Sequence, residues 1–291
     1  MKRRIGVIGG SGVYALEALD DVEKRAVETP WGEPSGPLTT GSLGGVEMIF
    51  LARHGEGHTI PPSEVNYRAN IDAMKRLGAT DILSISACGS FREELPPGMF
   101  VIVDQYIDRT SGRSGSFFGA GCVAHVSMAA PVCAALGDAL EASALALSIT
   151  CRRGGTYIAI DGPQFSSRAE SLLYKSWGAD VIGMTNMPEA KLAREAELPY
   201  ASLAMVTDFD CWRVESGHVE VAHILEVMRR NTEAARRLIA DVAARLGPTR
   251  EMSPAGIERT LDSALITPPD RRDPALLAKL DAVAGRVLAG G

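Results

Sequence analysis

The chain has 291 residues, of which 46% are hydrophobic and 23% charged, which suits one large α/β domain, or two smaller ones, with a substantial core. Its formal net charge of −6 argues against a general nucleic-acid-binding protein. No apolar run approaches the roughly 20 residues of a membrane span. The basic start leads into a short apolar run from Ile5 that glycine interrupts, which indicates a first strand and not a signal peptide.

The cysteines and the glycine-rich start limit the cofactors that we expect. The five cysteines are odd in number and have no CxxC spacing, which is typical of a reduced, cytoplasmic protein without a zinc site. The first glycine-rich turn is an incomplete GxGxxG, because Ala15 stands where a further glycine would be needed. We therefore expect neither a metal nor an organic cofactor.

Short apolar runs alternate with amphipathic helical stretches, which is typical of an α/β fold. The predicted strands are 4–8, 47–52, 81–86, 99–104, 156–160, 180–184 and 199–206. The predicted helices are 67–77, 131–147, 168–177, 188–196 and 219–246. Segment 108–122, rich in Gly, Ser and Phe, predicts a long functional loop. We expect one domain over residues 1–247, followed by a linker and a C-terminal helical extension over 248–291.

Three strand ends carry groups that could bind an anion. Ser11 lies in the first glycine-rich turn, where backbone amides can approach a phosphate, although any tight turn looks similar. Arg53 and His54 follow the second strand; a guanidinium can grip phosphate in a fork, but a surface ion pair is an equal alternative. Ser86 begins a small-residue turn that also contains Cys88, which we interpret as a packed thiol and not a nucleophile.

Two later turns could contact a flat, partly apolar ligand. Phe165 could stack on a heterocycle while Ser166 bonds its edge, although Ser166 or Ser167 could equally cap the next helix. Met184 offers a soft apolar surface, and Thr185 offers another hydroxyl. Val221 shares a helical face with Ile224 and Leu225, a pattern that is more often core than site.

Asp208 and Asp210 follow an apolar strand directly. If the backbone stays extended, both carboxylates point to the same side, and such a pair disfavours double ionisation. One protonated carboxyl beside one carboxylate can both donate and accept hydrogen bonds, which suits an adenine edge. A helix cap or a solvated loop is the alternative at even odds.

Taken together, these segments resemble the purine nucleoside phosphorylase superfamily, specifically its S-methyl-5'-thioadenosine phosphorylases. The segments are 9–12, 51–55, 62–67, 87–90, 162–171 and 207–212, and the likeness covers roughly residues 4 to 246 in order. The resemblance implies a single-domain fold around a mixed, partly closed sheet (a partly closed barrel) flanked by helices. It also implies a homotrimer or a dimer of trimers. No role is carried onto the tail after Leu246.

The resemblance also implies roles for the residues named above. Orthophosphate, a co-substrate, would be held by Ser11, Arg53, His54, Ser86, Ala87 and Thr185. The nucleoside would be bound by Phe165, Ser166, Met184, Asp208, Asp210 and Val221, the last beside a 5'-methylthio group. His125 matches a position that reaches into the neighbouring subunit's site.

The implied reaction is the phosphorolysis of S-methyl-5'-thioadenosine to adenine and 5-methylthioribose 1-phosphate, with Asp210 favoured over Asp208 as the proton donor. A phosphorylase of 6-oxopurine nucleosides or of methylthioinosine is the nearest alternative. An oxidoreductase binding a dinucleotide would need an acidic residue where Arg53 stands, and a non-catalytic nucleoside-binding protein would show no phosphate dependence.

Overall fold

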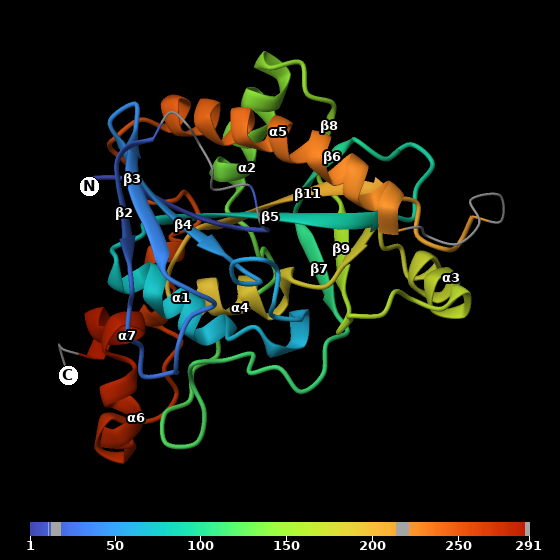
Figure 1. Cartoon of the computed structure of the whole chain (residues 1–291). Helices are drawn as coiled ribbons and strands as arrows, with labels where there is room; N and C mark the ends of the chain where they lie inside the picture. The colour runs from blue at the N-terminus through green and yellow to red at the C-terminus, as the bar shows by residue number, and fades with distance from the viewer. Residues whose placement is uncertain (11, 13–18, 214–220, 289–291) are drawn as a thin grey trace.

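A branched, mixed sheet with helices on both faces forms the frame of the molecule (Figure 1). The computed structural model describes residues 1–10, 12, 19–213 and 221–288, the side chains of 221–224 excepted. The strands are β1 (Arg4–Gly9), β2 (Asp20–Arg25), β3 (Leu38–Leu43), β4 (Val46–Ala52), β5 (Asp81–Ser90), β6 (Phe100–Val103), β7 (Gln105–Asp108), β8 (Cys151–Arg153), β9 (Thr156–Ala159), β10 (Val181–Gly183) and β11 (Tyr200–Asp208).

The sheet forks at β5. The first half of β5 pairs in parallel with β1, which leads through β4 and β3 to β2. Along its other side β5 pairs in parallel with β11, which carries β6 and then β8, while Gly89 and Ser90 turn aside to pair antiparallel with β10, followed by β9 and β7. No ladder joins β6 to β7 within the described residues, so the expected mixed α/β sheet is confirmed but the sheet is not closed.

Alternation along the central strands builds a core on each face of the sheet. In β11, Leu203 and Met205 pack into one hydrophobic cluster, and Tyr200 and Val206 pack into the other. The helices α2 (Ala134–Ala146) and α5 (Val221–Leu246) cover the first face, and α1 (Tyr67–Arg76) and α4 (Asn186–Glu195) cover the second (Figure 1). In the described part of the chain, no helix combines the length and the apolarity of a membrane span.

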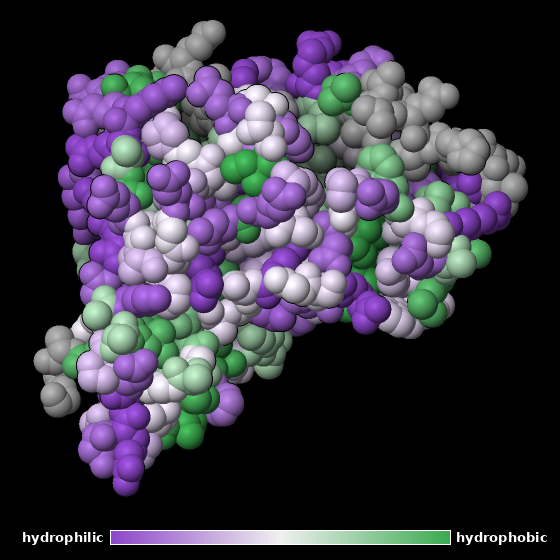
Figure 2. All heavy atoms as spheres, turned by 60° about the horizontal axis from the view of Figure 1, so that its bottom comes forward, coloured by the Kyte–Doolittle hydropathy of each residue, from purple (hydrophilic) through white to green (hydrophobic). Residues whose placement is uncertain are grey.

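The C-terminal segment completes the second face. It comprises η3 (Ile257–Asp262), η4 (Pro269–Arg271), α6 (Pro274–Lys279) and α7 (Asp281–Leu288). Leu280 and Val283 join the core cluster beneath α1, and Arg286 forms a forked ion pair with Glu197. Figure 2 shows the face on which this segment lies as mostly hydrophilic, with apolar side chains among the polar ones toward its lower left.

Several predicted boundaries differ from the structure. The sequence pattern missed β2, whose six residues are all exposed and mostly charged, and the short strands β3 and β8. The predicted strand 99–104 corresponds to β6 alone, and β7, which begins directly after it at Gln105, was missed. The small-residue turn predicted after Ser86 is wrong, because β5 continues to Ser90 and pairs with β11 over this stretch.

Candidate active site

A cavity of about 320 Å³ opens where the carboxyl ends of several strands meet. The first half of the sheet lines it with Gly10 just beyond β1, with Arg53 and His54 just beyond β4, and with Ser86 to Gly89 of β5. The second half contributes Ile160, Phe165 and Ser166 from beyond β9, Ile182 to Thr185 from β10 and its end, and Met205, Thr207 and Asp208 from β11, with Asp210 just beyond it. The sequence therefore predicted most of the segments that surround this cavity.

One side of the cavity carries hydroxyl groups. Ser86 is buried in β5, and its hydroxyl has no hydrogen-bond partner among the described residues. Thr185 precedes α4 and is also buried, with its hydroxyl 3.4 Å from the side-chain oxygen of Asn186. Ala87 lines the cavity beside them. A buried hydroxyl without a partner is costly, so this side is chemically suited to a polar ligand.

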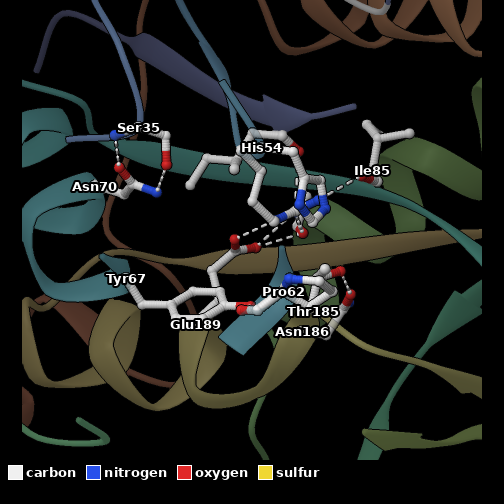
Figure 3. A network of polar contacts seen from close by, with 12 residues as sticks. Ser35, His54, Pro62, Tyr67, Asn70, Ile85, Thr185, Asn186 and Glu189 are labelled. Atoms are coloured by element: carbon white, nitrogen blue, oxygen red, sulfur yellow. Dashed lines mark hydrogen bonds and ion pairs between the residues drawn. The ribbon is translucent and has the colours of Figure 1, made fainter. Parts of the chain in front are cut away.

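Arg53 lies at the bottom of the same side, in a dense polar network. Its side chain is 1% exposed, and its Nε and Nη2 atoms lie 2.7 and 3.0 Å from the two carboxylate oxygens of Glu189. Ser84 and the carbonyl groups of Ile8 and Ile85 accept further hydrogen bonds from it. Figure 3 shows Glu189 reaching from α4 toward the strand end that carries His54, with Thr185 and Asn186 at the start of the same helix.

These contacts define how much of Arg53 is available to a ligand. Burial lowers the pKa of the guanidinium, but the charge and hydrogen bonds of Glu189 outweigh that effect and raise it above its ordinary value. The contacts account for Nε, for both Nη2 hydrogens and for one Nη1 hydrogen. One Nη1 hydrogen is left over among the described residues. Arg53 is therefore a buried structural ion pair that keeps a single donor near the cavity.

His54 is a neutral imidazole at neutral pH. Burial, together with the positive charge of Arg53, lowers its pKa to about 4. Its Nδ1 lies 2.9 Å from the carbonyl oxygen of Ile60, and because a carbonyl can only accept, Nδ1 carries the hydrogen and Nε2 is an acceptor. The ring stacks on His58 at 4.3 Å between centroids, and both rings line the cavity.

The opposite side carries the two aspartates, and their backbone is not extended. β11 bulges between Val206 and Asp208, and Asp210 has a left-handed backbone with φ of 51°. The prediction of an extended pair is therefore wrong. The two residues nevertheless converge, because the Asp210 N–H donates to Asp208 Oδ1 at 2.7 Å. Asp208 Oδ2 accepts a second hydrogen bond, from the Thr207 hydroxyl at 2.8 Å.

Asp210 differs from Asp208 in its surroundings. It is 5% exposed, and its Oδ2 has no hydrogen-bond partner among the described residues. Burial raises the pKa of Asp210 to about 6; the nearby Ser171 hydroxyl acts in the opposite direction, and the charge of Asp208 adds to the effect of burial. Gly89 leaves the space that the pair occupies, since a Cβ atom there would lie 2.9 Å from Asp208 Oδ1.

The turn after β9 carries Phe165 and Ser166, which line the cavity beside the aspartates and are called the shelf below. Ser167 and Glu170 make a reciprocal capping box at the start of α3 (Arg168–Ser176), so the helix-capping interpretation is confirmed for Ser167. Ser166 instead lines the cavity, with a buried hydroxyl that has no partner among the described residues. Phe165 lines it too, and the Cys211 thiol lies 3.2 Å from the carbonyl oxygen of Ser166. Ser167 therefore caps the helix, while its neighbour Ser166 faces the cavity.

Met184 connects the two sides. It lines the cavity between Gly183 and Thr185. Gly162, with φ of 65°, leaves room for it, because a Cβ atom at that position would lie 2.4 Å from the Met184 sulfur. The cavity therefore offers hydroxyls and an imidazole on one side, a thioether in the middle, and two carboxyl groups on the other.

Three predicted residues are not placed in this cavity. Ser11 lies outside the described residues, and so does the side chain of Val221, whose backbone begins α5. His125 is exposed, and its N–H donates to the carbonyl of Ala264 in the C-terminal segment. Since His125 does not line this cavity, its role toward a neighbouring subunit stays a prediction.

Sequence reasoning missed other residues at the site. Met228 and Thr232 line the cavity one helical turn apart on α5, and their i, i+4 spacing could have indicated them. His58 and Pro62 also line it. Glu189, the partner of Arg53, gave no local signal, because the two residues are 136 positions apart.

Comparisons with known proteins identify the family of the chain. Residues 4–244 match the model of the phosphorylase superfamily. The chain is 60% identical to the S-methyl-5'-thioadenosine phosphorylase of Cereibacter sphaeroides over 100% of both chains, and 56% identical to that of Bradyrhizobium diazoefficiens over 98% of both.

Solved structures give the same result. A methylthioadenosine phosphorylase from an antarctic soil metagenomic library superposes with a TM-score of 0.92 at 45% identity, covering 97% of this chain and 99% of the other. The Schistosoma mansoni methylthioadenosine phosphorylase in complex with adenine superposes with a TM-score of 0.81 at 42% identity, covering 86% and 93%. The chain therefore belongs to the phosphorylase superfamily, within the family of S-methyl-5'-thioadenosine phosphorylases.

Proposed function

We propose that the protein cleaves S-methyl-5'-thioadenosine with orthophosphate, giving adenine and 5-methylthioribose 1-phosphate. The observation that carries this proposal is one cavity whose lining combines the hydroxyl groups of Ser86 and Thr185, the neutral imidazole of His54 and the carboxyl groups of Asp208 and Asp210. The family to which the chain belongs, whose relatives are named for this substrate, supports the same assignment.

The aspartate side would receive the base. Breaking the bond between C1' of the sugar and N9 sends its electron pair into the purine, and a proton delivered to N7 stabilises that charge. Asp210 suits this step, because its Oδ2 is buried without a hydrogen-bond partner among the described residues, and its raised pKa of about 6 gives it a larger protonated fraction at neutral pH than an ordinary aspartate has. Asp208, which accepts two hydrogen bonds, would stay a carboxylate and accept from the exocyclic amino group.

The hydroxyl side would position phosphate. Ser86 and Thr185 can donate to its oxygens, and the spare Nη1 hydrogen of Arg53 can add a third donor. His54, neutral and with Nε2 free to accept, can bind a protonated phosphate oxygen. An unprotonated oxygen then bonds to C1' as the base leaves. Phosphate is already a nucleophile, so orientation is the main contribution of these groups.

The remaining assignments belong to the same proposal. Met184 would lie against the ribose, Phe165 and Ser166 along the base, Ser11 and Ala87 near phosphate, Val221 near the 5'-methylthio group, and His125 in a neighbouring subunit's site. We also propose a cytoplasmic enzyme of purine and methionine salvage, a homotrimer or dimer of trimers, that needs no cofactor. Its catalytic domain would span 1–247 and its helical extension 248–291.

Adenine release from S-methyl-5'-thioadenosine, followed with and without orthophosphate, tests the proposal. We expect release only with phosphate, together with 5-methylthioribose 1-phosphate in equal amount. Release without phosphate would indicate a hydrolase. Cleavage of inosine or methylthioinosine, with S-methyl-5'-thioadenosine left intact, would assign the site to an oxopurine instead.

Asp210→Asn tests the proton donor. The amide cannot deliver a proton to N7, so we expect kcat on S-methyl-5'-thioadenosine to fall at least about tenfold. Asp138→Asn is a matched control, because Asp138 is exposed on α2, where it pairs with Arg153, and does not line the cavity. Near-normal turnover of the Asp210 variant would move the donor role to Asp208 or to water.

A further inference from the structure

Arg113 is a buried cation in the long connection between β7 and α2, the segment predicted from the sequence as a functional loop. Its side chain is only 2% exposed, although its neighbours Gly112 and Ser114 are exposed. It does not line the cavity. Because burying a guanidinium is costly unless its donors are satisfied, the contacts of Arg113 indicate what the residue does.

The two ends of the guanidinium reach different parts of the fold. Nη1 donates to the carbonyl oxygens of Met184 at 2.7 Å and Met187 at 2.8 Å, in the connection from β10 into α4. Nη2 donates to the carbonyl oxygens of Asp161 at 2.8 Å and Ile160 at 3.3 Å, beyond the end of β9. One side chain therefore joins two backbone segments that are more than 20 residues apart.

A third segment is held through side chains. Nη1 lies 3.2 Å from the Tyr67 hydroxyl, and Nη2 lies 3.2 Å from the Ser63 hydroxyl. The Tyr67 hydroxyl in turn donates to the carbonyl of Pro62 at 2.9 Å, and Figure 3 shows Tyr67 extending from α1 toward Pro62. This connects Arg113 to η1 (Pro62–Glu64).

Each of these three segments contributes to the cavity. Met184, Ile160 and Pro62 all line it. Thr185, on the hydroxyl side, follows Met184 directly, and the Phe165–Ser166 shelf begins a few residues after Asp161. A shift of the guanidinium would therefore move the hydroxyl side and the shelf relative to each other.

The loop itself is fixed at this point. Asp161 accepts hydrogen bonds from the Ser111 N–H at 3.0 Å and the Ser111 hydroxyl at 2.7 Å, and its Oδ1 lies 3.7 Å from Nε of Arg113. The six hydrogen bonds of Arg113 are divided between its two terminal nitrogens, three on Nη1 and three on Nη2. A single ammonium on a flexible stem cannot reproduce this arrangement.

We propose that Arg113 is a positioning residue. Through the backbone of Met184 and of Ile160–Asp161, it sets the distance between the hydroxyl side of the cavity and the Phe165–Ser166 shelf. The inference rests on the proposed function for its readout. It assigns to the predicted loop 108–122 a role in aligning the two substrates for reaction.

Misalignment has a recognisable kinetic signature. A displacement on the order of 1 Å of reacting groups costs about 100-fold in rate, and it weakens both substrates, because each is held by one of the two parts that Arg113 joins. Arg113→Lys keeps the positive charge and loses the fork. We expect it to lower kcat/KM for S-methyl-5'-thioadenosine at least about tenfold and to raise KM for both the nucleoside and phosphate.

Arg109→Lys is the matched control, since Arg109 lies on the same connection but is exposed over the Trp177 ring. It should stay within about twofold of the wild type. Guanidinium ion at millimolar concentration should restore activity to Arg113→Ala, whereas urea, which has the same shape without the charge, should not.

The outcomes separate the possibilities. The proposal would be overturned if Arg113→Lys had wild-type kinetics or raised KM for only one substrate. It would also be overturned if guanidinium restored the melting temperature of Arg113→Ala without restoring turnover. If the Arg113 variants do not fold, Asp161→Asn weakens the hydrogen bonds to Ser111 and the ion pair to Arg113 that hold the loop in place, and unchanged KM values for both substrates in it would overturn the proposal too. A wild-type protein that releases no adenine with phosphate would instead contradict the proposed function.

Discussion

Two buried carboxyl groups near the cavity have opposite surroundings. Glu189 is 1% exposed and accepts hydrogen bonds from Arg53, Ser84 and Tyr200, so both of its oxygens are satisfied. Asp210 is 5% exposed, and its Oδ2 has no partner among the described residues. Buried polar groups are ordinarily bonded within the protein. The difference separates a carboxylate that holds the fold from a carboxyl that the proposed function assigns to the base.

Removing the charge of Glu189 tests the difference between the two carboxyl groups most strongly. Glu189→Gln leaves the buried Arg53 without its counter-charge, and we expect the free energy of unfolding to fall by about 3–5 kcal/mol. Urea denaturation measures the loss. Glu23→Gln is the control, because Glu23 pairs with Arg25 on the surface and should cost less than about 1 kcal/mol. Equal costs for the two variants would contradict a structural role for Glu189.

Asp210→Asn should have the opposite effect on stability. The folded pKa of about 6 is higher than the ordinary value of about 3.9 for an unfolded chain. The ionised form is therefore disfavoured in the folded protein, and the wild type loses stability as pH rises from about 4 through about 6. The free energy of unfolding of the Asn variant minus that of the wild type should therefore be about 2 kcal/mol larger at pH 8 than at pH 4. A stability difference that does not change with pH would show that Asp210 titrates normally.

Gly89→Ala should disturb the part of the cavity around Asp208 and Asp210 and leave the Arg53–Glu189 ion pair intact. A Cβ atom would lie 2.9 Å from Asp208 Oδ1 and 3.4 Å from the Asp210 Cβ atom. We expect kcat/KM for the nucleoside to fall at least about tenfold, with KM for phosphate nearly unchanged. Gly36→Ala is the control, since nothing lies within 4 Å of that position. Equal values of kcat/KM for the nucleoside in the two variants would contradict a steric clash between a Cβ atom at position 89 and Asp208.

Local patterns in the sequence predicted much of this fold. The alternation of apolar runs located most strands and helices, and the Ser167–Glu170 spacing predicted the cap of α3. The charged strand β2 was missed because none of its residues is buried, so it has no alternating pattern. The continuation of β5 through Ser90 depends on pairing with β11 and β10, which the local sequence does not record.

The site was predictable in its residue types and less so in its geometry. Asp208 and Asp210 converge as expected, yet through a bulge and a left-handed turn and not along an extended strand. Arg53 was expected to grip phosphate, whereas most of its donors are directed to Glu189 and Ser84. Both differences arise from contacts between residues far apart in the sequence, and Arg113 was missed for the same reason.

The role of Asp210 as the donor to N7 is tested most directly by changing the leaving group. A 5-methylthioribosyl substrate whose leaving group departs as a stable anion needs no proton, so loss of the donor should matter little. We predict that Asp210→Asn lowers kcat on S-methyl-5'-thioadenosine at least about tenfold more than it lowers kcat on the activated substrate. An equal loss on both substrates would contradict the account, because Asp210 would then position the base without protonating it.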